Sequence, residues 1–123
     1  MNFKTEKFED VVVIHVYLNR ATLTKAVEFK EYINNEIKEG CSKIIIDLGF
    51  CEYIDSTFLG AIVSSLKKVA SMNGDLRLVY NKEMPSLVFV ITRMDKVFKV
   101  FSTVEEALAS FNISGSKPTL QWK

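Results

Sequence analysis

The fold is decided by one stretch of the chain, IIIDLGFCEYIDSTFLG at residues 44–60. It begins with three isoleucines, an apolar run that is typical of a strand buried on both faces at the centre of an α/β sheet. Asp55, Ser56 and Thr57 follow after a short connection, directly before a helical pattern. Residues of this kind cap helices, because the backbone N–H groups of the first helical turn lack partners. The same N–H groups and the helix dipole also favour an attached phosphate.

Strand-like and helix-like segments alternate on both sides of this stretch. Segments rich in β-branched and aromatic residues predict strands, and apolar residues spaced three or four apart predict helices. A last helix is expected to open at Ser102, which forms a capping-box pattern with Glu105. The expected strands are residues 3–8, 11–18, 43–48, 76–80 and 97–101, the first two forming a hairpin, and the expected helices are residues 22–39 and 57–73. Residues 84–94 fit either a strand or a short helix.

Composition and charge place the chain among ordinary single-domain proteins. Its 123 residues are enough to bury a core without disulfides or metals. The net charge of +1 gives no electrostatic reason to expect binding to nucleic acid or to a membrane surface. No apolar run approaches the ~20 residues that span a bilayer, and the N-terminus has no signal-peptide core. Cys41 and Cys51 are therefore expected to be free thiols in the cytoplasm.

The residue patterns of common enzymes are missing from the sequence. There is no glycine-rich phosphate-binding motif, no Cys/His set with metal-ligand spacing and no catalytic-triad signature. His15, the only histidine, has no cluster of possible partners nearby in sequence and is interpreted as a strand residue. Asp47 ends a buried strand, as a receiver-domain phosphoacceptor does, but the acidic pair that such a site needs does not follow the first strand. We therefore expect no enzymatic activity, cofactor or metal.

The central stretch and its continuation resemble the signature of the STAS domain, specifically that of bacterial anti-sigma factor antagonists. The matching features are the Asp-Leu pair at 47–48, the segment DSTFLG at 55–60, the Lys-Lys pair at 67–68 and the Asn-Gly turn at 73–74. In outline, the resemblance extends from near residue 3 to Phe111.

This resemblance implies a fold as well as a family. The expected architecture is a mixed central sheet of about five strands, with about four helices mainly on one face. It favours a short helix at residues 84–94. The domain is expected to span residues 1–113, and residues 114–123 look like a loose tail.

Ser56 has two interpretations. As a helix N-cap it would contribute roughly 1 kcal/mol to stability. As a phosphorylation site it would gain about −1.5 to −2 charges at the start of a helix, which tolerates them. A neutral docking surface would then become a strongly hydrated anion that is costly to desolvate. Binding would be switched off without unfolding, and Asp55 would add like-charge repulsion.

The family resemblance implies the second interpretation. In anti-sigma factor antagonists, the first Ser after the Asp is phosphorylated by the anti-sigma factor, which is itself a kinase. The unphosphorylated antagonist sequesters the anti-sigma factor and frees a sigma factor, and a phosphatase resets the system. Carried over, Ser56 is the acceptor, Thr57 is the second choice and Asp55 orients the site. The expected partners are an anti-sigma factor serine kinase and a serine phosphatase, with no direct contact to nucleic acid, and the chain is expected to be a monomer or weak dimer.

Two departures from the family pattern concern the partner-facing surface. Phe58 stands where the family usually has Gly, so its ring either alters that surface or sits in the core. The stretch YLNR at 17–20 lacks the Gly and Asp of the family's Gly-x-Leu/Ile-Asp segment. The residues expected to bind the partner are Asn19, Arg20, Asp55, Ser56, Thr57 and Phe58.

Two alternative functions stay open at this point. The chain could be a STAS interaction module of another complex, in lipid transport or stress signalling, with Ser56 only a helix cap. The altered stretch at 17–20 and Phe58 motivate this alternative. A small hydrolase or nucleotide-binding protein is the third hypothesis, and its only support is that nucleotide binding has been proposed for some STAS relatives.

Overall fold

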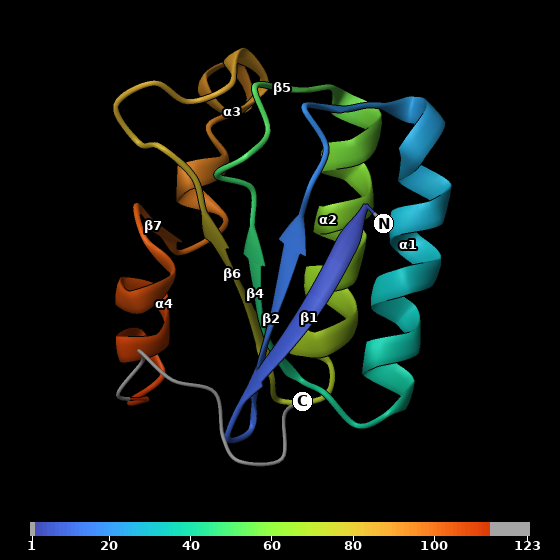
Figure 1. Cartoon of the computed structure of the whole chain (residues 1–123), viewed down its shortest axis with the longest axis vertical. Helices are drawn as coiled ribbons and strands as arrows, with labels where there is room; N and C mark the ends of the chain where they lie inside the picture. Colours follow the sequence, from blue (N-terminus) through green and yellow to red (C-terminus); the bar gives the residue numbers. More distant parts are fainter. Residues whose placement is uncertain (1, 114–123) are drawn as a thin grey trace.

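A five-stranded mixed sheet in the order β1-β2-β4-β6-β7 forms the centre of the structure (Figure 1). The computed structural model describes residues 2–113, so the tail expected at 114–123 lies outside the described residues. β1 pairs with β2 in an antiparallel hairpin, and all other neighbours in this sheet are parallel. The strands of the sheet are β1 (Phe3–Phe8), β2 (Val11–Val16), β4 (Lys43–Asp47), β6 (Asp75–Val79) and β7 (Val100–Phe101).

The apolar run that opens the decisive stretch is the central strand, as predicted. All three isoleucines of β4 are fully buried. Ile44 and Ile46 belong to the core on one face of the sheet, whereas Ile45 belongs to the core on the other. A strand that is covered on both faces has no polar side to present, which explains the unbroken apolar run.

Helices cover both faces of the sheet, but unequally. α1 (Leu23–Lys38) and α2 (Ser56–Ala70) pack together over the larger core, and α4 (Val104–Ser110) covers the smaller core on the opposite face (Figure 1). The fourth helix, α3 (Leu87–Thr92), lies at one end of the sheet. The predicted mixed sheet with about four helices is confirmed, and the two longest helices, α1 and α2, lie on one face, while α4 lies on the other and α3 at one end.

Several predicted boundaries need correction. The strand expected at 11–18 ends at Val16, the strand expected at 97–101 is only Val100–Phe101, and the helix expected at 57–73 is Ser56–Ala70. α4 is capped by Thr103, whose hydroxyl accepts a hydrogen bond from the N–H of Glu106 at 3.1 Å, and Glu106 accepts one from the N–H of Ser102 at 3.2 Å. The cap therefore lies one residue later than the predicted Ser102, and Glu106 in place of Glu105 reaches back beyond it to Ser102. The segment expected to be helical at 84–94 holds only α3, which ends at Arg93 with a left-handed backbone (φ 56°) before the 3-10 helix η1 (Met94–Lys96).

The state of the cysteines and the character of the helices can also be compared with expectation. Cys41 and Cys51 are free thiols, as expected. In the part of the chain that the structure describes, no helix combines the length and the apolar character needed to cross a bilayer.

Candidate functional site

A second, two-stranded sheet that the sequence did not reveal builds the site. β3 (Arg20–Ala21) pairs in parallel with β5 (Tyr53–Ile54). The carbonyl of Asn19 accepts hydrogen bonds from the N–H groups of Glu52 (2.8 Å) and Tyr53 (3.2 Å). These bonds join the connection after β2 to the connection after β4. The altered stretch at 17–20 and the Asp-Ser-Thr segment, which are far apart in sequence, thereby become neighbours.

Asp55 holds the beginnings of two helices. Its Oδ1 accepts a hydrogen bond from the N–H of Phe58 at 2.9 Å, which caps α2. Its Oδ2 accepts one from the N–H of Leu23, the first residue of α1, at 2.8 Å. Thr22 occupies the N-cap position of α1 but makes no capping hydrogen bond with its own side chain. One carboxylate therefore serves both helix N-termini, whose partial positive charges favour it.

Ser56 is not the helix cap, so that interpretation of the residue is wrong. α2 begins at Ser56, and the cap is the preceding residue, Asp55. Ser56 and Thr57 are both exposed on the first turn. Within residues 2–113 the Ser56 hydroxyl has no hydrogen-bond partner, so it has no structural role that a modification would disturb.

Phe58, which was expected to bind the partner, is instead part of the core. Its side chain is 0% exposed, and its ring lies 4.8 Å from that of Phe29, centroid to centroid. The ring points inward because Phe58 lies on the same apolar stripe of α2 as Ile62. The structure therefore brings together five of the six expected residues and leaves Phe58 beneath them. These five exposed or half-buried residues are Asn19, Arg20, Asp55, Ser56 and Thr57.

Exposed apolar side chains surround this polar centre, and sequence reasoning missed them. Leu23 and Val27 on α1 are 61% and 67% exposed, and Leu87 on α3 is 67% exposed. α3 is tied to the site because the N–H of Ile54 donates a hydrogen bond to the Ser86 hydroxyl at 3.1 Å. We call the following residues together the Ser56 surface: Asn19, Arg20, Leu23, Val27, Asp55, Ser56, Thr57, Met84, Leu87 and Ile91.

The Ser56 surface has the make-up of a protein-binding site. α3, β5 and the beginnings of α1 and α2 lie at the same end of the molecule, at the top of Figure 1. The guanidinium of Arg20 covers the ring of Tyr53 at 4.3 Å, which holds one edge of the surface in place. Exposed large apolar side chains near polar groups are typical of a place where another protein docks.

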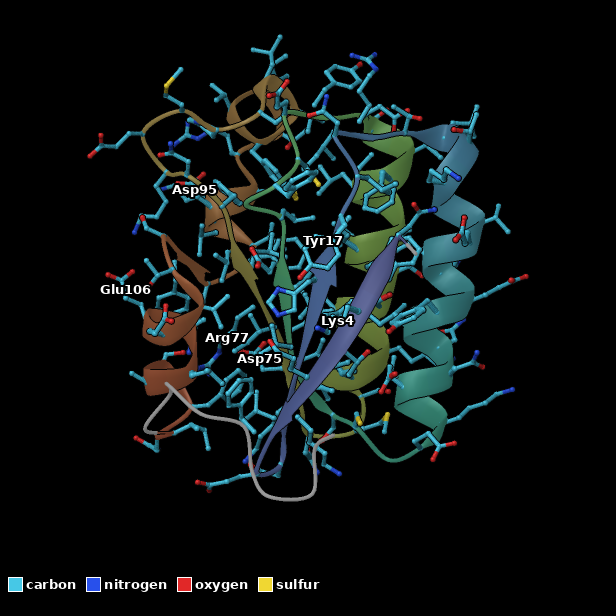
Figure 2. All side chains as sticks on the ribbon, viewed as in Figure 1. Lys4, Tyr17, Asp75, Arg77, Asp95 and Glu106 are labelled. Carbon is cyan, nitrogen blue, oxygen red and sulfur yellow. The ribbon has the colours of Figure 1, made fainter. Side chains whose placement is uncertain are left out.

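A second polar cluster, around His15, lies on the face of the sheet that α4 covers. Nδ1 of His15 is 2.8 Å from Asp47 Oδ2, and Nε2 is 2.6 Å from Glu6 Oε1. Tyr17, labelled in Figure 2, stacks on the imidazole with ring centroids 5.8 Å apart. The hydrogen bonds and charges of Asp47 and Glu6 raise the pKa of His15 above its ordinary value. His15 is a strand residue, as interpreted, but the carboxylates that it lacks in sequence reach it across the sheet.

The arrangement shows no catalytic chemistry around the thiols. Burial raises the pKa of Cys51 to about 12, so its thiol is a poor nucleophile at neutral pH. Burial also raises the pKa of Cys41. Among residues 2–113, no group of three His, Cys, Asp or Glu side chains is placed to hold a metal ion.

Comparison with known proteins shows which family the chain belongs to. The family described as "STAS domain" matches residues 2–107. A Thermotoga neapolitana protein described as "Putative anti-sigma factor antagonist TM1081 homolog" is 38% identical over 104 residues, which cover 81% of this chain and 88% of that protein. A Thermotoga maritima protein with the description "Putative anti-sigma factor antagonist" is 34% identical, with 83% of this chain and 91% of that protein covered.

Solved structures show the same fold. The crystal structure of TM1081 from Thermotoga maritima superposes with a TM-score of 0.79 at 31% identity, covering 89% of this chain and 94% of that one. SpoIIAA of Bacillus in its phosphorylated form superposes with a TM-score of 0.66 at 20% identity, covering 89% and 98%. At that identity the second likeness shows the fold alone. A structure of unphosphorylated SpoIIAA is also known, with a TM-score of 0.63.

Proposed function

Because the chain belongs to the STAS domain family and its relatives carry the description of anti-sigma factor antagonists, we propose that it works as a phosphorylation-controlled binding module. Unphosphorylated, it sequesters an anti-sigma factor that is a serine kinase, and so regulates sigma-factor-dependent transcription. Phosphorylation of Ser56 releases the kinase, and a serine phosphatase restores the binding form. The protein acts in the cytoplasm and catalyses no reaction itself.

One observation carries this proposal: the capping hydrogen bonds are made by Asp55 and not by the neighbouring Ser56. Asp55 supplies the capping interaction for both α1 and α2, whereas Ser56 is exposed on the first turn of α2. A phosphate on the Ser56 hydroxyl therefore removes no hydrogen bond from the fold. The two helix N-termini that meet at Asp55 also provide a favourable field for the added charge.

The apolar rim explains how such a phosphate would block docking. Burial of Leu23 and Leu87 against a partner would stabilise the complex, and the neutral Ser56 hydroxyl at the same end of the molecule costs little to bury. A phosphoserine with about −1.5 to −2 charges is strongly hydrated, and burying an unpaired ion costs several kcal/mol. An uncompensated cost of about 3–4 kcal/mol would weaken binding by roughly two to three orders of magnitude.

The relatives support the proposal at the level of the fold. SpoIIAA is known in both its phosphorylated and its unphosphorylated form. This fold therefore accommodates a phosphate in at least one protein. Phe58 is buried, so this departure from the family pattern does not place a bulky ring on the Ser56 surface.

The test begins with a pulldown from a lysate of the native cell. The baits are wild type, Ser56→Ala and Ser56→Asp, with Thr57→Ala as the matched control for a neighbouring exposed hydroxyl. We expect wild type, Ser56→Ala and Thr57→Ala to retain a kinase-like ATPase, and Ser56→Asp to lose it. Retention of the same kinase by Ser56→Asp would contradict the switch.

The retained kinase is then purified and incubated with ATP and each variant. Intact-mass measurements should show one added phosphate on wild type and on Thr57→Ala, and none on Ser56→Ala. Equal phosphorylation of Ser56→Ala would move the acceptor to another residue. Circular dichroism of each variant confirms that the fold is unchanged.

A second candidate function is a STAS interaction module of another complex, in lipid transport or stress signalling. The observation that favours it is the altered stretch at 17–20, where Arg20 covers the ring of Tyr53. In this case the same partner, which need not be a kinase, should remain bound to Ser56→Asp. The Arg20→Ala variant should then lose it, because the edge of the Ser56 surface is no longer held.

A further inference from the structure

A cavity of about 890 Å³ lies between the ends of β6 and β7 and the segment that holds α3 and η1. Its size falls in the range of small-molecule sites, about 300–1,000 Å³. The rings of Tyr80 and Phe89 stack in its wall with centroids 4.3 Å apart, and Phe98 and Phe101 also line it. Tyr80, Phe89 and Phe98 are buried, so the wall is part of the fold and does not consist of mobile surface side chains.

The cavity lies beside the edge strand β7 and next to the carboxyl end of β6. β6 and β7 are parallel, and Tyr80 follows directly after β6. Ligands of open α/β sheets bind outside the carboxyl ends of the strands. None of the residues that line the cavity belongs to the Ser56 surface, so the two features are separate.

Charged side chains of mostly one sign accompany the aromatic wall. Lys82, Arg93 and Lys99 are exposed and line the cavity, and Asp95, which lies in η1 and is labelled in Figure 2, is the single acidic residue of its lining. Within residues 2–113 none of the three cations forms an ion pair. The mouth of the cavity therefore carries an excess of two positive charges, which favours an anionic ligand and weakens with added salt because the cations are exposed.

Arg93 forms the left-handed C-cap of α3, at the turn into η1. Arg93 has a φ of 56°, and a non-glycine residue with a left-handed backbone is uncommon. Glycine would adopt this turn between α3 and η1 at lower cost. The sequence instead places a planar cation there, of the kind that binds carboxylate, sulfonate and phosphate groups.

We propose that this cavity binds a small organic anion with a flat apolar body. The body packs against the accessible apolar lining, Val90 and Phe101, and the acidic group lies at the mouth with Arg93, Lys82 and Lys99. The proposal does not rest on phosphorylation at Ser56, because the two sites use different residues, although both include side chains of α3.

The test compares two probes of nearly the same shape, one of which is charged. The charged probe is 1-anilinonaphthalene-8-sulfonate, and its uncharged parent is N-phenyl-1-naphthylamine. Fluorescence titration of the full chain should show one binding site for the sulfonate, and NMR shifts should cluster at residues 80–101. Removing all three cations in Lys82→Gln/Arg93→Gln/Lys99→Gln should weaken sulfonate binding about tenfold or more and leave the uncharged probe within about twofold.

Two controls make each result decisive. Lys67→Gln/Lys68→Gln removes two cations from the exposed side of α2 and should change neither affinity. Val90→Trp narrows the cavity and should abolish binding of both probes, whereas Leu87→Trp on the outer side of the same helix should not. Sulfonate binding that survives the triple variant or Val90→Trp would overturn the proposal, as would NMR shifts that cluster elsewhere. An equal loss of both probes in the triple variant, with an unchanged melting temperature, would overturn the role of charge.

Discussion

The carboxylate of Asp55 joins the beginnings of α1 and α2, so its removal should weaken both helices at once. In Asp55→Ala the N–H groups of Leu23 and Phe58 both lose their acceptor. In Asp55→Asn a single amide oxygen remains and can satisfy one of them. The two substitutions therefore remove two bonds and one bond from the same place, with almost no change in packing for Asn.

The expected loss of unfolding free energy follows from the two hydrogen bonds that Asp55 accepts. Removing a helix N-cap costs about 0.5–2 kcal/mol, and a hydrogen bond to a charged group contributes about 1.5–3 kcal/mol. Asp55 is only half-buried, so water replaces part of each bond and the lower values apply. We expect Asp55→Ala to lose about 2–3 kcal/mol of unfolding free energy and Asp55→Asn about half of that. At roughly 3–5 °C per kcal/mol for a chain of this size, the melting temperature of Asp55→Ala should fall by roughly 6–15 °C.

Urea and thermal unfolding followed by circular dichroism measure these losses. Thr103→Ala is the matched control, because Thr103 caps α4 with a single bond to an uncharged hydroxyl and should cost about 1 kcal/mol. If Asp55 bridges the two helices, Asp55→Ala should lose the most unfolding free energy, and Asp55→Asn and Thr103→Ala should each lose less, by similar amounts. If Asp55→Ala costs no more than Thr103→Ala, the bond to Leu23 contributes nothing and the reasoning is wrong.

Three further predictions concern the core and the opposite face. Asp47 and Glu6 raise the pKa of His15, so the stabilisation from this cluster is complete below about pH 6.5 and is lost as the pH rises through the folded-state pKa of His15. The difference in unfolding free energy between wild type and His15→Gln, measured from urea midpoints, should therefore shrink as the pH rises. A difference that stays constant with pH would contradict this prediction. Cys51, with its pKa of about 12, should react with iodoacetamide at pH 8 only in urea, and rapid labelling of the folded chain would refute the burial argument. Phe58→Ala should cost about 3–5 kcal/mol and Ser56→Ala less than about 0.5 kcal/mol, so equal urea midpoints would contradict their placement.

Local sequence patterns were sufficient for the elements that form the core. The three isoleucines of β4 form an unbroken apolar run because the strand is covered on both sides. The helical spacing of Phe58 and Ile62 placed α2 correctly for the same reason, since one face of the helix is buried. The hairpin, the central strand and the helices that cover it were therefore predictable from residues close together in the chain.

The polar contacts were not predictable, because they depend on register. Asp55 and Ser56 are both good capping residues, and the choice between them is fixed by the hydrogen bond from the N–H of Asp55 to the carbonyl of Ala21 across the small sheet. In the same way, His15 meets Asp47 only because the two residues are paired in the register of β2 and β4. The residues next to Asp55 and His15 in sequence contain no signal that predicts either contact.

The bond from Leu23 to Asp55 joins residues 32 positions apart, and this separation has a kinetic consequence. Contacts between distant residues form late in folding, because closing the loop between them costs entropy before any contact is gained. A nascent or misfolded chain carries Ser56 but not the two helix starts gathered around it. A kinase that recognises the assembled surface would therefore act only on molecules that have finished folding. The level of phosphorylation would then report the supply of folded protein, whatever the rate of its synthesis.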